Sequence, residues 1–415
     1  MPVIPVQYES LKTILPYMDP NTRFRISLRM PSISSLESRI PLKIENLTFS
    51  CEDTKVNEVS YLLGVYRDYG RNEFPSAVLE MNRCGGSPDD IDQYGVFIYP
   101  GKNNVLPGDI DLRTAVQEDV PANAEEWEQG LVQQLRVLKI LLAERLNQEY
   151  IEDDETRNAV VGGFFNALLE MQYRELTLNE SVETIQLGIQ TLRDMLRGFN
   201  NRRDNRIPPY TAWIQLSTRS PKGITIQRVA YNKYLYEATK TVHTKLFGNR
   251  GSSISVKNLK IDIFDRILRF PAATSLKIEN LEVAFWNSLA FDRFKQAIHP
   301  SSFPIQQVKI GSSIRAPDFP HTIAREAQIL IINNDTYEFA SWTPILLNLT
   351  NQGVVLENEN RLNPPNNYMD LIENWLERGR PVGTCFDMCI KSEETVKQCL
   401  DTLKQRQEVI GSSKK

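Results

Sequence analysis

Short apolar segments recur along the second half of the chain, and each is too short to bury its own hydrophobic side. They lie at residues 258–261 (NLKI), 275–278 (SLKI), 307–310 (QVKI), 328–334 (QILIINN) and 353–358 (GVVLEN). Their β-branched and apolar residues predict strands. The first residues of successive segments are 17, 32, 21 and 25 positions apart. Such units bury their apolar edges against one another, so the pattern predicts a sheet assembled from stacked strand-and-helix units.

Two architectures are compatible with this spacing. The separations scatter around the roughly 20–29 residues of leucine-rich repeats, which form a curved solenoid lined by strands. An ordinary open sheet is the alternative. The hexamer LKIENL occurs at residues 42–47 and again at 276–281, which indicates related sheet units in the two halves of the chain.

The region between residues 124 and 199 carries a different pattern. Trp127, Leu131, Leu135, Leu138, Leu142 and Leu146 are spaced by threes and fours, which predicts a long amphipathic helix. A second periodic run follows at 160–171, and a third begins at Ser181. Such stripes pack within the molecule or form coiled-coil contacts, so we interpret the region as an inserted helical hairpin or bundle.

The remaining segments complete an α/β (α+β) protein. Strands are predicted within residues 41–49, 59–70, 77–83 and 94–100, and on both sides of Ser220-Pro221-Lys222-Gly223. Helices are predicted before Gly248, before Gly379 and after Ser392, with a strand at 383–390. The predicted organisation is a helical hairpin at 1–38, a small β-rich unit at 39–120, a helical insertion at 121–204 and an α/β domain at 205–410.

The first thirty residues predict two short helices on either side of Asp19-Pro20. Asp19 is a good N-cap, Pro20 suits the first helical position, and Pro31 marks the end of the second helix. About 25 residues hold too little core to fold alone, so their apolar side chains must pack on the rest of the chain or on another protein. Those side chains are Leu11, Ile14, Leu15 and Met18 before the break and Phe24, Ile26, Met30 and Ile33 after it.

This segment resembles an F-box. The residues that match the motif in order and spacing are Glu9, Leu11, Ile14, Leu15, Tyr17, Met18, Asp19, Pro20, Arg25, Ile26 and Ser27. Further strings are LKIENLTFS, PGDIDLRT, RRDNRIPPYTAWIQL, ERGRPVGTCF and VKQC. With them, most of the chain is similar to the nematode-expanded F-box C proteins, which carry an associated domain of unknown function.

The resemblance implies a substrate-receptor subunit of a cullin-RING ubiquitin ligase. The N-terminal hairpin would dock on the Skp-type adaptor, and the C-terminal domain would bind an unknown protein substrate. The adaptor contacts would come from Leu11, Ile14, Leu15, Met18, Pro20 and Ile26. Substrate contacts would come from the sheet units after Val256 together with Tyr337, Phe339 and Trp342, for which core packing is the alternative. The alternative function is a non-catalytic interaction or regulatory protein whose hairpin no longer binds the adaptor.

Composition argues against several classes of partner. A net charge of −4 and a pI near 5.7 disfavour a general nucleic-acid binder, and Arg202, Arg203 and Arg206 are interpreted as a solvated linker. The five cysteines indicate no disulfide framework, which fits a reducing cytoplasmic or nuclear compartment. No run of 18 apolar residues and no signal-peptide core are present, so we expect no membrane association.

No motif of the sequence predicts catalysis, a metal or a cofactor. Cys385 and Cys389 are four residues apart without further zinc ligands, and burial as small hydrophobic residues is the expected fate of both. His243, His299 and His321 are scattered, although a catalytic triad can assemble in space from distant residues. The acidic run at 152–155 lacks the spacing of a calcium loop and is interpreted as solvated. We therefore expect a protein that is not an enzyme.

Overall fold

The computed structural model divides the chain into two compact units. Unit 1 comprises Met1–Val59, Val105–Thr114 and His243–Lys415, and unit 2 comprises Ser60–Asn104 and Ala115–Val242. The residues that the structure describes are 8–71, 74–98, 105–113, 124–157, 180–285, 287–311, 321–333, 337–338, 341–357, 361–362, 366–388, 390 and 392–405. The boundaries of the two units differ from those of the four predicted segments. The reason is that strands from both ends of the sequence share one sheet.

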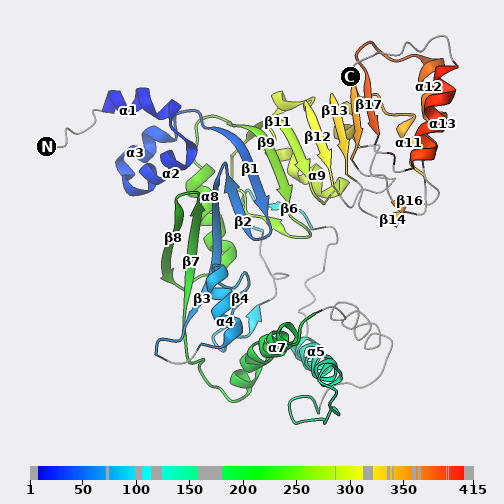
Figure 1. Ribbon diagram of the computed structural model, residues 1–415. Helices are drawn as coiled ribbons and strands as arrows, with labels where there is room; N and C mark the ends of the chain where they lie inside the picture. The colour runs from blue at the N-terminus through cyan, green and yellow to red at the C-terminus, as the bar shows by residue number, and fades with distance from the viewer. Residues whose placement is uncertain are drawn as a thin grey trace. The chain divides into compact units, whose positions relative to one another are not determined.

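Unit 1 is built on a mostly parallel sheet (Figure 1). β1 (Lys43–Ser50) lies between β2 (Asp53–Val56) and β9 (Ile254–Asp262), and only its pairing with β2 is antiparallel among these described strands. Beyond β9 the sheet continues in sequence order with parallel strands. They are β11 (Leu276–Val283), β12 (Gln307–Ile310), β13 (Ile329–Ile332), β15 (Gly353–Leu356) and β17 (Cys385–Met388).

The core of unit 1 lies on one face of this sheet. The strand register places apolar residues side by side in two continuous rows. One row is Leu47, Leu259, Leu281, Val308, Leu330 and Val354; the other is Phe49, Ile261, Val283, Ile310, Ile332 and Leu356. All of these side chains are buried. At about 1.5–3 kcal/mol for each buried side chain, these rows are the main reason why the repeated apolar segments assemble.

The repeated hexamer has a structural explanation. Its two copies lie in β1 and β11, on opposite sides of β9, where Ile44, Val256 and Ile278 share one register position. In all three strands the next buried residue comes three positions later instead of two. The pairing skips Glu45, Lys257 and Glu279 at this point. The pattern L-x-I-x-x-L therefore reflects an interruption, at the same position in the three strands, of the alternation between buried and exposed side chains.

Short helices connect the parallel strands of unit 1. They are α9 (Ser288–Phe294), η3 (Lys295–Ala297), η4 (Pro300–Ser302), α10 (Thr322–Glu326), α11 (Thr343–Leu346) and α12 (Tyr368–Arg378). α13 (Glu393–Lys404) follows β17, and Ser392 caps it through the backbone N–H of Thr395. A small ladder between β6 (Ile110–Asp111) and β10 (Ile267–Leu268) holds residues 105–113 against unit 1. The buried ion pair between Arg269 and Asp109 reinforces this attachment.

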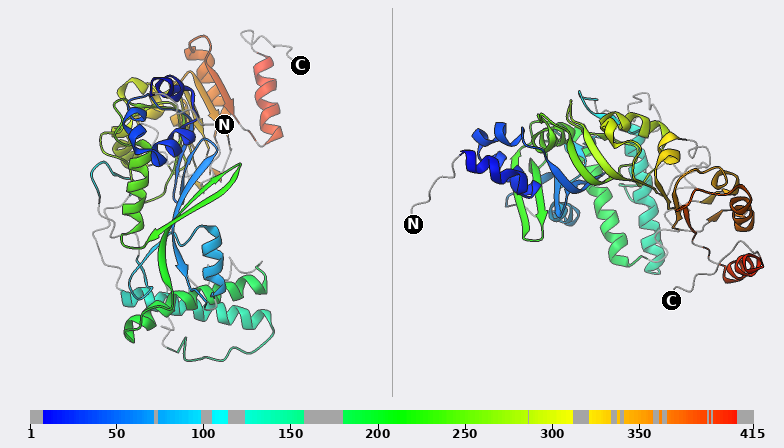
Figure 2. Two further views of the ribbon diagram at one scale, coloured as in Figure 1. Left: turned by 90° about the vertical axis from the view of Figure 1, so that its left-hand side faces the viewer. Right: turned by 90° about the horizontal axis from the view of Figure 1, so that it is seen from above.

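Unit 2 has an antiparallel sheet and a pair of long helices (Figure 2). β3 (Val59–Asp68), β7 (Thr211–Ser220) and β8 (Gly223–Ala230) pair in that order. α5 (Ala124–Arg145) and α7 (Val182–Arg203) share one apolar core, as their periodicity predicts. A buried ion pair of 2.7 Å between Arg67 on β3 and Asp194 on α7 ties the helices to the sheet. Two short strands, β4 (Asp90–Ile91) and β5 (Phe97–Ile98), complete this unit, and α8 (Leu235–Phe247) spans the boundary between the units.

Three sequence expectations in this region have different outcomes. The strands around Ser220 and the helix that ends at Gly248 are confirmed. The strand expected at residues 77–83 is wrong, because Ser76–Cys84 form the helix α4. Gly85, with a φ of 119°, ends α4 in a left-handed conformation. An apolar run of this length is ambiguous between the two structures, and the glycine that follows it was the signal that favoured a helix.

Candidate protein-binding surfaces

The N-terminal helical segment, residues 8–40, contains three α-helices and a short 3-10 helix where its sequence predicts two helices. It consists of α1 (Tyr8–Ile14), η1 (Leu15–Tyr17), α2 (Pro20–Arg29) and α3 (Pro31–Glu37). Asp19 caps α2 by accepting a hydrogen bond from the Thr22 backbone N–H, as expected. Pro31 ends α2 but also begins α3, so Ile33 belongs to a separate helix. Proline is well suited to both places because it disfavours a helical residue before it and suits the first helical position.

This segment has a small core of its own. Leu15, Leu36 and Ile40 are buried together, and Leu11 and Met18 pack against them while half-buried. The third helix supplies the partner that a two-helix hairpin lacks. Leu15 is fully buried as a result, because the segment closes over it.

A buried charge network attaches the segment to unit 1. The Arg23 guanidinium donates to Glu37 and to the carbonyl oxygens of Pro41 and Ile40 at 2.8 and 2.9 Å. Arg250, which follows α8, donates to both oxygens of Glu37 at 2.9 and 3.0 Å. Burial lowers the pKa of Arg23, and the Glu37 carboxylate opposes that effect. We call Arg23, Glu37 and Arg250 the anchor triad.

Aromatic packing adds to this attachment. Phe24 meets Phe247 edge to face, and Phe247 meets Phe49 of β1 in the same manner. Phe24 comes from the helical segment, while Phe247 and Phe49 belong to the body of unit 1. One side of α2 is therefore committed to the interior of unit 1.

Four other apolar side chains of the segment are exposed to solvent. The exposed fractions are 45% for Ile14, 88% for Tyr17, 49% for Leu28 and 50% for Met30. Exposed aromatic and aliphatic residues on a fixed helical segment are typical of protein-binding surfaces. We call these four residues the exposed apolar set.

The residues expected to contact an adaptor divide between interior and surface. Ile14 is exposed, and Leu11, Met18 and Ile26 are half-buried. Leu15 and Pro20 lie in the interior, where they pack against the protein's own residues. Helical spacing alone identified an apolar stripe but not the side of it that the third helix and unit 1 cover.

The second candidate surface is the face of the unit 1 sheet opposite its core, which we call the open face. Parallel sheets are usually buried on both faces, so partly exposed apolar residues on this face are unusual. On β13 and β15 the side chains of Ile329, Ile331 and Val355 are only half-buried. They lie beside one another, since Ile331 pairs with Val355 and follows Ile329 by two positions. These three side chains form an apolar end of the open face, where a protein partner could make hydrophobic contacts.

Polar ladders occupy the rest of the open face. Asn46, Asn258 and Asn280 are aligned across three strands, and each neighbouring pair is joined by a side-chain hydrogen bond of 2.9 or 2.8 Å. Lys257 donates to Glu45 at 2.6 Å one position earlier. These contacts satisfy the polar groups within the protein, so recognition at this end would depend on shape more than on free charge.

The aromatic residues proposed for substrate contact do not form a surface in the described residues. Trp342 is 2% exposed and lies in the core beside α11, which favours the alternative of core packing for this residue. Its backbone N–H donates to Asn366, which fixes the start of α11. Tyr337 belongs to β14 (Tyr337–Glu338), which pairs with β16 (Arg361–Leu362), but its side chain and all of Phe339 lie outside the described residues.

The histidines have structural partners. Buried His243 contacts the Thr54 hydroxyl at 2.7 Å and the carbonyl oxygen of Arg269 at 2.5 Å. His299 caps η4, and His321 caps α10 while contacting Asp292 at 3.1 Å. Cys385 is exposed, contrary to the expected burial, because β17 is the last described strand of the sheet; Cys389 is not described. Among the described residues, no group of three or more His, Cys, Asp or Glu side chains could hold a metal ion.

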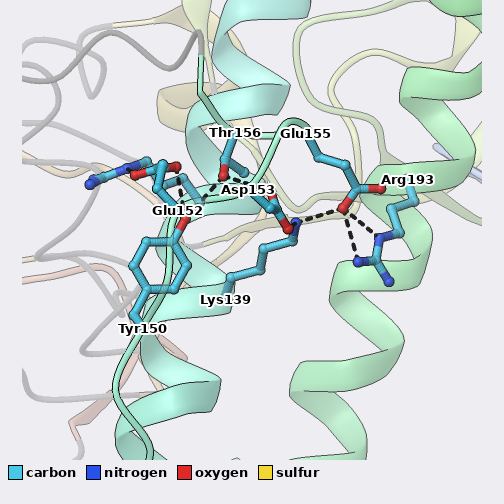
Figure 3. Close-up of polar contacts among 8 residues, drawn as sticks. Lys139, Tyr150, Glu152, Asp153, Glu155, Thr156 and Arg193 are labelled. Atoms are coloured by element: carbon cyan, nitrogen blue, oxygen red, sulfur yellow. Dashed lines mark hydrogen bonds and ion pairs between the residues drawn. The ribbon is translucent and has the colours of Figure 1, made fainter.

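The acidic run at 152–155 is paired with basic residues of the long helices (Figure 3). Lys139 of α5 donates to Asp153 and Glu155 at 2.5 Å, and Arg193 of α7 donates to Glu155 at 2.9 Å. Burial raises the pKa of Glu155, but the hydrogen bonds from Lys139 and Arg193 outweigh it and leave the pKa below its usual value. The run therefore connects its loop to both helices through ion pairs with basic side chains.

The basic cluster near residue 203 is also neutralised within unit 2. Arg202 pairs with Asp92, Arg203 with Glu128, and Arg206 with Asp204. The first two pairs join α7 to other elements of the unit. Arg202 and Arg203 form the last turn of α7, so the interpretation of the cluster as a linker is wrong for these two residues.

Comparisons with known proteins find one match, to a part of the chain. A family model described as a domain of unknown function, DUF3557, matches residues 234–392. This range begins with α8 and contains every described parallel strand of unit 1 from β9 to β17. Searches of curated proteins and of solved structures find no match. In the described residues, no helix is long and apolar enough to span a membrane.

Proposed function

We propose that this chain is a substrate-receptor subunit of a cullin-RING ubiquitin ligase and carries out no chemistry itself. The N-terminal helical segment docks the Skp-type adaptor, and the open face of unit 1 binds the protein to be modified. In this role the chain raises the rate of ubiquitin transfer by bringing the target close to the ligase. The resemblance of the first thirty residues to an F-box supports this proposal.

The observation that carries the proposal is the pairing of an exposed apolar set with a rigid attachment. Ile14, Tyr17, Leu28 and Met30 project from helices that the anchor triad fixes to unit 1. An adaptor that grips this segment would thereby hold unit 1 in a defined orientation. Preorganisation of this kind favours tight binding, because little conformational freedom is lost on association.

The open face supports the second half of the proposal. Its apolar end at Ile329, Ile331 and Val355 lies on strands far in sequence from the helical segment. Adaptor and target would therefore contact different residues. A receptor needs this separation, because it must hold both partners at once.

Co-purification of the full-length chain with a Skp-type adaptor tests the proposal. Ile14→Asp combined with Leu28→Asp should weaken adaptor binding at least about tenfold, because both side chains are exposed anchors whose loss leaves the fold intact. Ile207→Asp is the matched control, since Ile207 is 85% exposed but lies in unit 2. Substituting Leu15 would be uninformative, because that residue supports the fold of the segment.

Two results would contradict the proposal. One is no association with the adaptor, and the other is association that the Ile14 and Leu28 substitutions leave unchanged. Either result favours the alternative function, a non-catalytic interaction protein whose helical segment serves only as part of its own fold. The burial of Leu15 and Pro20, two positions of the motif, is the observation that favours this alternative.

A further inference from the structure

β8 is an edge strand with unusually complete exposure. It is the last described strand beyond β7 in the sheet of unit 2, and all eight of its residues are exposed. The exposed fractions of its large apolar side chains are 64% for Ile224, 52% for Ile226 and 56% for Val229. A strand of this kind leaves backbone N–H and C=O groups without a strand partner along its outer side.

Most of the usual protections of an edge strand are absent from β8. Natural edge strands are guarded by charged side chains, especially lysine, by proline, by bulges or by being short. Arg228 is the one charged residue of β8. The sequence of β8, GITIQRVA, holds neither lysine nor proline, and it pairs with β7 in an unbroken register from Gly223 to Ala230. The outer side of β8 is therefore regular and open to another strand.

One face of β8 carries an ordered pattern of side chains. Ile224, Ile226 and Arg228 alternate along the strand and so point to the same side of the sheet. Arg228 is held in place, because its Nε donates to Gln215 at 2.8 Å and its guanidinium lies 3.6 Å from the centre of the Tyr66 ring. It forms no ion pair with a carboxylate of the described residues. The face thus presents two apolar side chains followed by one fixed positive charge.

We propose that β8 binds an extended segment of another protein by β-strand addition. An extended backbone is the ligand that matches the outer side of the strand, because it supplies hydrogen-bond partners in register. The side chains of β8 define the chemistry of the segment. Two alternating apolar residues pair with Ile224 and Ile226, and an acidic residue two positions further along the same face pairs with Arg228. This proposal is independent of the ligase function.

Selection of peptides from a random display library on the full-length protein tests the proposal. The expected peptides share the alternating apolar, apolar and acidic pattern in one direction or the other. Ile224→Lys combined with Ile226→Lys adds the lysines that guard natural edges and should weaken binding of a selected peptide at least about tenfold. Ile207→Lys, at an exposed apolar position outside β8, should leave binding unchanged.

Two further measurements separate strand addition from unspecific apolar contact. Hydrogen exchange should slow for backbone amides within 223–230 when the peptide binds. Arg228→Glu should weaken the acidic peptide about two- to fivefold, and a peptide with lysine at the acidic position should regain that affinity.

Several outcomes would overturn the proposal. They are a selection that enriches no peptide, peptides that bind the double lysine variant equally well, and binding that leaves exchange within 223–230 unchanged. A fourth is a dimer of the chain that the double lysine variant converts to a monomer. In that case the strand beside β8 belongs to a second copy and not to another protein.

Discussion

Glu37 is the residue on which the attachment of the N-terminal segment depends. Two arginines share its carboxylate in the interior, so the site holds more positive than negative charge. The carbonyl oxygens of Ile40 and Pro41 compensate in part by accepting hydrogen bonds from Arg23. Removing one member of a buried ion pair is costly because the remaining charges stay desolvated.

Glu37→Gln should therefore destabilise unit 1 by about 3–5 kcal/mol, since it leaves two buried guanidinium groups without a counter-charge. The measurement is urea unfolding followed by circular dichroism. Glu282→Gln removes the partner of Lys260 in a pair that is 36–39% exposed, and its effect should stay within about 1 kcal/mol. Equal effects of the two substitutions would show that the anchor triad contributes no more than a surface pair.

The carboxylates near residue 153 provide a prediction about protonation. Burial raises the pKa of Asp153 and of Glu155, but hydrogen bonds and the charge of Lys139 together outweigh it and lower the pKa of each. Lys139 donates to both carboxylates, Thr156 also donates to Asp153, and Arg193 also donates to Glu155. Lys139→Met should therefore raise both pKa values, as followed by NMR titration of the carboxyl carbons. Lys12→Met, in the N-terminal segment, should change neither. A lowered pKa stabilises the fold above the usual carboxyl pKa of about 4, and this contribution is lost as the pH falls through the lowered value.

Unchanged pKa values in the Lys139 variant would mean that the contacts in Figure 3 do not persist in solution. If the pKa of Asp153 rises and the pKa of Glu155 does not, then Arg193 alone would account for the lowered pKa of Glu155.

At the scale of elements, the asparagine ladder explains how three strands keep one register. Asn258 of β9 donates to Asn46 of β1 and accepts from Asn280 of β11. A slip by one residue would place these amides on the core face and move the apolar rows to solvent. The ladder therefore works together with the buried rows to select a single alignment.

Asn258→Ala should cost about twice as much stability as Asn280→Ala, because it removes two hydrogen bonds of the ladder instead of one. With about 0.5–1.5 kcal/mol for each hydrogen bond, the difference is measurable by thermal unfolding. Equal losses in the two variants would show that the ladder bonds do not contribute independently. A slipped register would instead appear as changed exchange rates across β1, β9 and β11.

For the whole molecule, the chain passes back and forth between the two units. Unit 1 takes residues from the start, the middle and the end of the sequence, so each of its separate segments is needed to complete one fold. The N-terminal helical segment and the open face both belong to unit 1, while β8 belongs to unit 2. The three surfaces use different residues, which makes their functions separable by mutation.

Ile331→Lys combined with Val355→Lys should reduce recovery of target proteins and leave adaptor binding unchanged, if the proposed function is right. These half-buried residues form the apolar end of the open face, where lysines keep their charge in solvent and disrupt apolar contact. Affinity purification with quantitative mass spectrometry measures both partners in one experiment. Undiminished recovery of every target would exclude this face as the binding site, and loss of the adaptor would show that the surfaces are coupled.

The sequence by itself determined the elements whose signals are local. Caps at Asp19, Ser181 and Ser392 and the apolar periodicity of α5 and α7 correctly predict helices, because they depend on residues within a few positions. The repeated apolar segments likewise predict β9, β11, β12, β13 and β15, and the segment at 383–390 predicts β17. Tertiary structure alone decided which residues those elements meet. Glu37 and Arg250 are 213 positions apart, and β1 pairs with a strand more than 200 residues away.

The candidate surfaces depend on this second kind of information. Leu15 and Ile14 are neighbours in an apolar stripe, yet one is buried and the other is 45% exposed. Trp342 is an aromatic residue in a polar loop sequence, yet it belongs to the core. A periodic pattern establishes that a side chain needs an apolar environment. Only the folded chain decides whether its own residues provide that environment or leave it to a partner.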